Sequence, residues 1–152
     1  MSWLQECVEA FASVSSVSGS AYVRHLIQTL LSLAAHGECV IVGRGAAQVL
    51  PVETTLRVRL VAPLEWRIVA ISQKLGISRE QAARQIHMID HERVRFVKDH
   101  FHKEATDPRQ YDLILNSSRY SVGECAELIV EALRRLQAHG PVGSSTPLPS
   151  PS

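Results

Sequence analysis

The sequence lacks the features that mark several broad classes of protein. Its 16 basic residues are balanced by 15 acidic ones, so the net charge is only +1. That balance argues against non-specific nucleic-acid binding and against attraction to a membrane surface. No apolar run approaches the roughly 18 residues of a membrane-spanning helix. The chain also does not open with a basic segment followed by an apolar stretch, as a secretory signal does. Nucleic acid and membrane are therefore not expected partners.

Cysteines are few, odd in number and widely spaced, at positions 7, 39 and 125. Cys39 and Cys125 fall in apolar patterns, which are typical of inert core thiols. This usage predicts a protein of a reducing cytoplasm.

The 152 residues are enough for one domain, and the 45% of hydrophobic residues can supply its core. Residues 1–20 are predicted to be a peripheral segment, because 2–12 show weak helical periodicity and 13–20 are rich in serine. Residues 21–138 are predicted to form the domain. Residues 139–152 hold four of the seven prolines and four serines, so we expect a disordered tail.

The spacing of apolar residues predicts an α/β fold. Helices are expected over 21–35, 45–50, 63–75, 78–102 and 121–138. Strands are expected over 38–42, 56–61 and 111–115. Long connections between short apolar strands favour a short parallel sheet with helices on both faces, a three-layer α/β/α arrangement.

Two strand ends carry candidate phosphate ligands. After the apolar run 38–42, Gly43 allows a sharp turn and Arg44 follows at the carboxyl end, where open α/β sheets bind ligands. An arginine there can grip a phosphate with two parallel hydrogen bonds, or it can be a surface residue after a core strand. Arg57 and Arg59 share one strand face, and they either line a phosphate-binding cleft or are solvated.

Several short motifs together resemble the cytidylate-kinase-like family, a group of P-loop nucleoside-monophosphate kinases. In chain order they are Gly43-Arg44, the Leu56–Pro63 strand-to-helix step, Ile89-Asp90-x-x-Arg93, Asp107-Pro108-x-x-Tyr111-Asp112-Leu113 and Asn116-Ser117-Ser118. The resemblance covers about residues 21–135. It implies a P-loop nucleotide-kinase fold, and a transferase that moves a phosphoryl group from ATP, with Mg²⁺, to a nucleoside monophosphate.

The resemblance also assigns roles to residues. Arg44, which follows Gly43, would touch the phosphate of the acceptor, and Arg57 or Arg59 is expected near it from the strand pattern. Asp90 and Arg93 would be the catalytic pair on a lid helix, with Arg93 close to the transferred phosphates. The alternative for Arg93 is an ion pair with Asp90 or another acid on the helix surface. Asn116 and Ser117 would lie on the cofactor side.

The chain departs from the family pattern because it lacks a phosphate loop. The sequence contains no G-x-x-x-x-G-K-[ST] and no similar glycine-rich loop to cradle the donor phosphates. The strand before that loop is also missing, and 38–42 and 56–61 would flank its place. We therefore expect a kinase-like protein that is inactive as this chain alone, with its front part absent. The alternative is a non-catalytic remnant that binds a phosphorylated ligand or a protein partner.

An open sheet edge also favours self-association, with apolar surface from Leu4, Val8 and Phe11.

Two other kinds of binding site have only weak support in the sequence. The run from Gly43 has Gln48 where a dinucleotide-binding turn needs Gly or Ala. His87 and His91 lie one helical turn apart, but solvated histidines are the simpler interpretation, so no metal site is expected.

Overall fold

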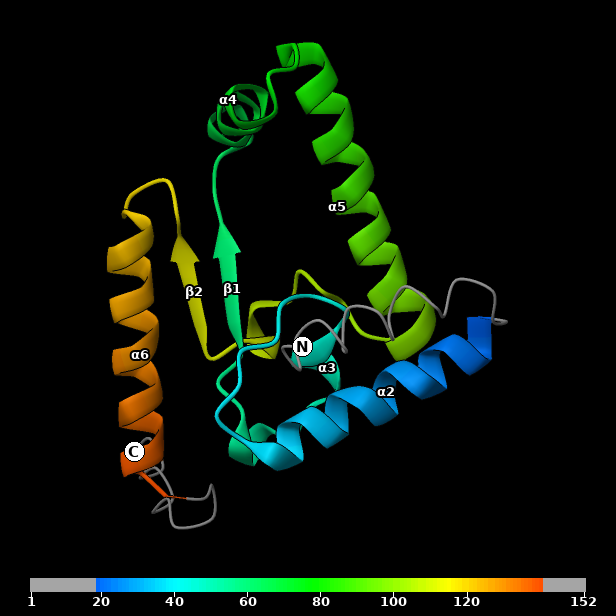
Figure 1. Ribbon diagram of the computed structural model, residues 1–152, viewed down its shortest axis with the longest axis vertical. Coiled ribbons are helices and arrows are strands. Elements are labelled where there is room, and N and C mark those ends of the chain that lie inside the picture. The colour runs from blue at the N-terminus through cyan, green and yellow to red at the C-terminus, as the bar shows by residue number, and fades with distance from the viewer. Residues whose placement is uncertain (1–18, 141–152) are drawn as a thin grey trace, which may run out of the picture. The chain divides into compact units, whose positions relative to one another are not determined.

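The computed structural model describes residues 19–140. The chain falls into two compact units, Met1–Leu50 and Pro51–Ser152 (Figure 1). The predictions for residues 1–18 and for the tail from 141 onward lie outside the described residues. The single domain expected over 21–138 stays a prediction.

The first unit is built on helix α2 (Gly19–His36), which confirms the predicted helix and extends it slightly at each end. Leu26 and Leu30 of α2 are buried. The short helix α3 (Ala46–Val49) packs against α2, and its Ala46 is buried as well. The neighbouring Leu31 of α2 is 43% exposed. The buried stripe of α2 is therefore narrower than its apolar pattern suggests.

The strand predicted over 38–42 is wrong. Residues 39–42 have no regular secondary structure, and the side chains of Val40 and Val42 are 90% and 88% exposed. A strand needs a hydrogen-bonded neighbour, and no strand within residues 19–140 pairs with this segment. An apolar run alone does not make a strand, because half of the required hydrogen bonds belong to another segment.

The second unit contains the sheet. Strands β1 (Val58–Val61) and β2 (Leu113–Asn116) are parallel neighbours. The chain between them forms α4 (Leu64–Leu75), α5 (Arg79–Phe101) and the 3-10 turn η3 (Pro108–Gln110). A second 3-10 turn, η2 (Val52–Thr54), precedes β1. Helix α6 (Val122–Ala138) follows and lies beside β2 (Figure 1). The short parallel sheet with its helices confirms the α/β class.

Local signals place the helix ends. Ser78 and Gln81 form a capping box at the start of α5, and Ser121 and Glu124 form one at the start of α6. Gly76 ends α4 with a φ of 64°, a left-handed conformation that glycine adopts readily. The helices therefore begin and end within a residue or two of their predicted limits.

The α4–α5 hairpin has its own apolar core. Ile68 of α4 is buried with Ala82 and Ile86 of α5, and further apolar side chains pack around them: Ile71, Ile77 and Ala83. Ile89, further along α5, is 40% exposed. The hairpin holds α4 and α5 at a fixed separation, so polar side chains between the two helices have defined partners.

Candidate functional site

An ion pair joins α4 and α5 just beyond their apolar core. The guanidinium of Arg67 donates two hydrogen bonds to the carboxylate of Asp90, from Nη1 to Oδ2 and from Nη2 to Oδ1, each 2.7 Å long. The two side chains are 30% and 42% exposed. This parallel two-bond geometry is the strongest form of an arginine–carboxylate contact. Asp90, a predicted catalytic residue, is thus fixed by a residue that the sequence did not single out.

The electrostatics of the pair follow from this geometry. The hydrogen bonds from Arg67 lower the pKa of Asp90 against the opposing effect of burial, and the charges of Arg67, Arg93 and His87 lower it further. The same hydrogen bonds raise the pKa of Arg67. Asp90 is therefore an ionised acceptor of hydrogen bonds at neutral pH, and it is unsuited to act as an acid.

Arg93 lies one turn after Asp90 and its side chain is exposed. In the part of the chain that the structure describes, its guanidinium has neither a hydrogen bond nor an ion pair. The alternative that Arg93 pairs with Asp90 is therefore wrong, because Asp90 pairs with Arg67. By helical spacing, Arg93 and Asp90 share the face of α5 that carries the buried Ile86 and Val97. An exposed cation on an otherwise inward face is suited to bind an anion.

The structure gives Arg57 and Arg59 defined contacts. Arg57 immediately precedes β1 and its guanidinium pairs with Asp112. Arg59, within β1, donates a hydrogen bond of 3.0 Å from Nη1 to the backbone oxygen of Thr106 and lies over the ring of Tyr111. Both contacts hold the sheet to the segment before β2. A role for these arginines in substrate binding stays a prediction.

Asn116 and Ser117 lie at the carboxyl end of β2. The Ser117 N–H donates to the oxygen of Val61 at 2.8 Å, which fastens the end of β2 to the end of β1. The side-chain oxygen of Asn116 accepts hydrogen bonds from the N–H and hydroxyl of Ser118 at 3.1 and 2.6 Å. These contacts shape the turn after β2, and the predicted role in cofactor binding stays a prediction.

Gly43 and Arg44 belong to the first unit and form a tight turn. The Ala46 N–H donates to the Gly43 oxygen at 3.2 Å, and the two central residues, Arg44 and Gly45, have φ values of 56° and 70°. Positive φ at both central residues is typical of a type I′ turn. Such a φ is unfavourable for a residue with a Cβ. The turn presents an exposed Arg44 at a backbone position that glycine would occupy with less strain.

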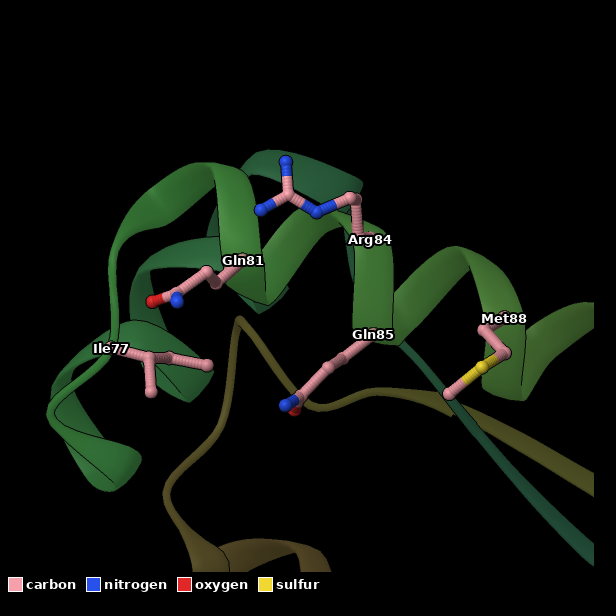
Figure 2. Close-up of a pocket in the computed structure, with 5 residues that line it drawn as sticks. All are labelled: Ile77, Gln81, Arg84, Gln85 and Met88. Carbon is pink, nitrogen blue, oxygen red and sulfur yellow. The ribbon is translucent and has the colours of Figure 1, made fainter.

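A shallow hollow of about 250 Å³ on the hairpin contains none of the predicted site residues. Figure 2 shows its lining, four side chains of α5 and one from the turn before it: Gln81, Arg84, Gln85, Met88 and Ile77. The α5 positions follow one face of a single helix. This hollow is therefore a surface feature of α5 and has no convergent polar groups from other elements.

Residues 19–140 contain no group of three or more His, Cys, Asp or Glu side chains that could hold a metal ion. No helix in the same range is long and apolar enough to cross a membrane.

Comparison with known proteins gives one family. The profile of the Cytidylate kinase-like family matches residues 1–119. The match includes the first twenty residues, which the resemblance had left out, and it ends before α6. The candidate residues of both units fall within it.

Two curated proteins are similar to the chain. A cytidylate kinase from Methanopyrus kandleri is 31% identical over 109 residues, which are 66% of this chain and 56% of that protein. A uronate isomerase from Corynebacterium glutamicum is 28% identical over 125 residues, 82% of this chain and 24% of that protein. The chain thus spans just over half of one relative and about a quarter of the other.

Proposed function

Because the chain belongs to the cytidylate kinase-like family, we propose that it binds a nucleoside monophosphate and does not transfer a phosphoryl group by itself. In the second unit the binding residue is Arg93 on α5, beside Asp90, and in the first unit Gly43 and Arg44 in the turn after α2 are separate candidate phosphate ligands. The observation that carries the proposal is the exposed guanidinium of Arg93 beside an Asp90 already paired with Arg67.

The chemistry of phosphate recognition supports these residues. Phosphoryl-transfer proteins need positioning and positive charge around the phosphates more than any covalent chemistry. A guanidinium offers planar donors that match two phosphate oxygens, so Arg44 and Arg93 are the appropriate residue type. The ionised carboxylate of Asp90 accepts hydrogen bonds only. Its hydrogen bonds come from Arg67, so we assign Asp90 no direct contact with the bound ligand.

ATP and Mg²⁺, the cofactors of the intact family, do not fit the described residues. ATP phosphates are held by backbone N–H groups of a glycine-rich loop, and the 152 residues contain no such loop. Mg²⁺ is bound by one or two carboxylates together with substrate phosphates. Asp90 and Asp112, the half-buried acids of the hairpin and the sheet, each accept hydrogen bonds from an arginine instead.

A coupled assay with ATP and the common nucleoside monophosphates tests the catalytic half of the proposal. The 152-residue chain is expected to give no turnover above background. Turnover that Arg93→Ala abolishes would contradict the proposal, because it would show that this chain completes an active site without a phosphate loop.

Calorimetric titration with cytidine monophosphate tests the binding half. Wild type is expected to bind, and Arg93→Ala is expected to weaken binding by about tenfold, the loss of one charge-assisted contact. Arg95→Ala is the matched control, because Arg95 lies on the same helix and pairs with Asp99. Equal affinities for wild type and Arg93→Ala would remove Arg93 from the site.

The same titrations separate the second candidate, a non-catalytic protein that binds another phosphorylated ligand. That candidate predicts that inorganic phosphate binds at Arg93 as tightly as cytidine monophosphate does, whereas a nucleoside-monophosphate site binds cytidine monophosphate more tightly than phosphate. For either function we propose a reducing, cytoplasmic location, since Cys39 and Cys125 are both free thiols.

A further inference from the structure

Two ion pairs join α4 to α5, and they differ in kind. Arg79 of α5 and Glu65 of α4 make a single contact of 2.7 Å between side chains that are 58% and 75% exposed. Arg67 and Asp90 make two contacts between half-buried side chains. An exposed pair contributes little to holding two helices together. The Arg67–Asp90 pair is the stronger link, and it alone involves a residue of the proposed site.

Asp90 has three basic neighbours, Arg67, Arg93 and His87, and the two arginines are the candidates for its ion pair. Arg93 is three residues away on the same helix, a spacing at which Asp and Arg side chains pair in isolated helices. Arg67 comes from the neighbouring helix and engages both carboxylate oxygens at 2.7 Å. The two-bond contact is the stronger of the two alternatives. Asp90 therefore receives both of its strong hydrogen bonds from Arg67, and within residues 19–140 the guanidinium of Arg93 forms no hydrogen bond or ion pair, although its charge acts on Asp90.

We propose that Arg67 is a positioning residue that keeps Arg93 available to an anionic ligand by occupying and neutralising Asp90. The inference rests on the proposed function, because it takes the phosphate of a nucleotide as the anion at Arg93. Without Arg67, the Asp90 carboxylate is free to turn toward Arg93, and its uncompensated charge repels a phosphate nearby. Arg67 thus acts on the ligand through another pair of residues and does not touch it.

The experiment is a titration of the full chain with inorganic phosphate, followed by the NMR signal of the Arg93 Nε–H group. Wild type is expected to show a saturable shift. Arg67→Ala should weaken phosphate binding by roughly threefold or more, because a carboxylate next to the anion is no longer neutralised. Arg67→Ala combined with Asp90→Asn should restore binding, since the competing charge is gone. Arg79→Ala, which breaks the other pair between the helices, should bind as wild type does.

Each outcome has a defined meaning. Loss in Arg67→Ala with restoration in the double variant supports the proposal. Loss of phosphate binding in Arg67→Ala without restoration in the double variant shows that Arg67 only holds α4 and α5 together, and it overturns the proposal. Phosphate binding by Arg67→Ala at the wild-type affinity also overturns it. An unchanged affinity in Arg93→Ala overturns the proposed function instead. If Arg67→Ala does not fold, Arg67→Lys serves, because a single ammonium cannot engage both oxygens in parallel and should give a partial loss that Asp90→Asn reverses.

Discussion

Arg57 holds the carboxylate of Asp112 with its backbone and its side chain at once. The Arg57 N–H donates to Oδ2 at 2.7 Å, while Nε and Nη2 donate to Oδ2 and Oδ1 at 3.2 and 2.9 Å. In return, the Asp112 N–H donates to the Arg57 oxygen at 2.8 Å. The two residues lie 55 positions apart and immediately precede β1 and β2. This clamp sets the register in which the two parallel strands begin.

The clamp predicts a large effect on stability. Asp112→Ala should lower the free energy of unfolding by about 2 kcal/mol, because it leaves the half-buried guanidinium and N–H of Arg57 without their acceptor. Asp99→Ala is the matched control. It breaks an exposed pair with Arg95 within one helix and should cost less than about 0.5 kcal/mol. Urea denaturation measures both, and equal losses would show that the clamp has no special weight.

The clamp also predicts acid sensitivity. Burial raises the pKa of Asp112, but the hydrogen bonds and charge of Arg57 outweigh burial and leave the pKa lowered. A lowered folded-state pKa contributes stability that is complete above the ordinary value of about 3.9 and is lost as the pH falls through the folded value. Unfolding measured between pH 6 and pH 2 should therefore show a shallower loss in Asp112→Asn than in wild type. Arg57→Gln should show the same shallower loss, and a wild-type slope in either variant would contradict this cause.

The turn at Arg44 predicts opposite effects on stability and binding. Arg44→Gly should raise the free energy of unfolding by about 0.5 to 1 kcal/mol, because glycine adopts the positive φ without a Cβ clash. The same change should weaken cytidine monophosphate binding, since it removes the guanidinium. Arg44→Ala keeps the Cβ, and it should weaken binding without the gain in stability. Undiminished nucleotide binding by both variants would make Arg44 an ordinary surface residue.

The capping boxes predict a further pair of losses. The Ser78 hydroxyl accepts from the Gln81 N–H at 3.1 Å, and the Ser121 hydroxyl accepts from the Glu124 N–H at 3.2 Å. Each serine replaced by alanine should cost about 1 kcal/mol of unfolding free energy. Ser32 is a suitable control, because its hydroxyl donates to the Gln28 oxygen inside α2 and its replacement should be neutral. Similar losses at all three serines would rule out capping as the cause.

Self-association stays a prediction, now with a defined surface. Within residues 19–140, β1 and β2 pair only with each other, and Leu60 of β1 is 57% exposed. Exposed strand edges recruit other chains. Sedimentation at micromolar concentration should show a dimer that Leu60→Glu weakens. Leu75→Glu, at a similarly exposed position at the end of α4, should leave it intact, and a monomer in wild type would refute the idea.

The amino-acid sequence by itself determined the helices and their ends. Ser78 with Gln81, Ser121 with Glu124, and Gly76 act over a few residues, so their signals are readable without knowledge of the fold. The alternation of apolar and basic residues from Leu56 to Arg59, which indicates β1, is an equally local signal. Strands β1 and β2 begin about two residues later than predicted, because strand limits depend on the partner strand.

Only the tertiary structure decided which segments and side chains meet. The apolar run 39–42 has the composition of a strand, yet no strand within residues 19–140 pairs with it. Asp90 has a basic neighbour in its own helix, yet it pairs with Arg67, 23 positions away, because the packing of α4 on α5 brings two parallel hydrogen bonds into reach. Pairing of this kind depends on distance in space, which sequence spacing does not encode. That choice of partner leaves Arg93 exposed and unpaired among the described residues.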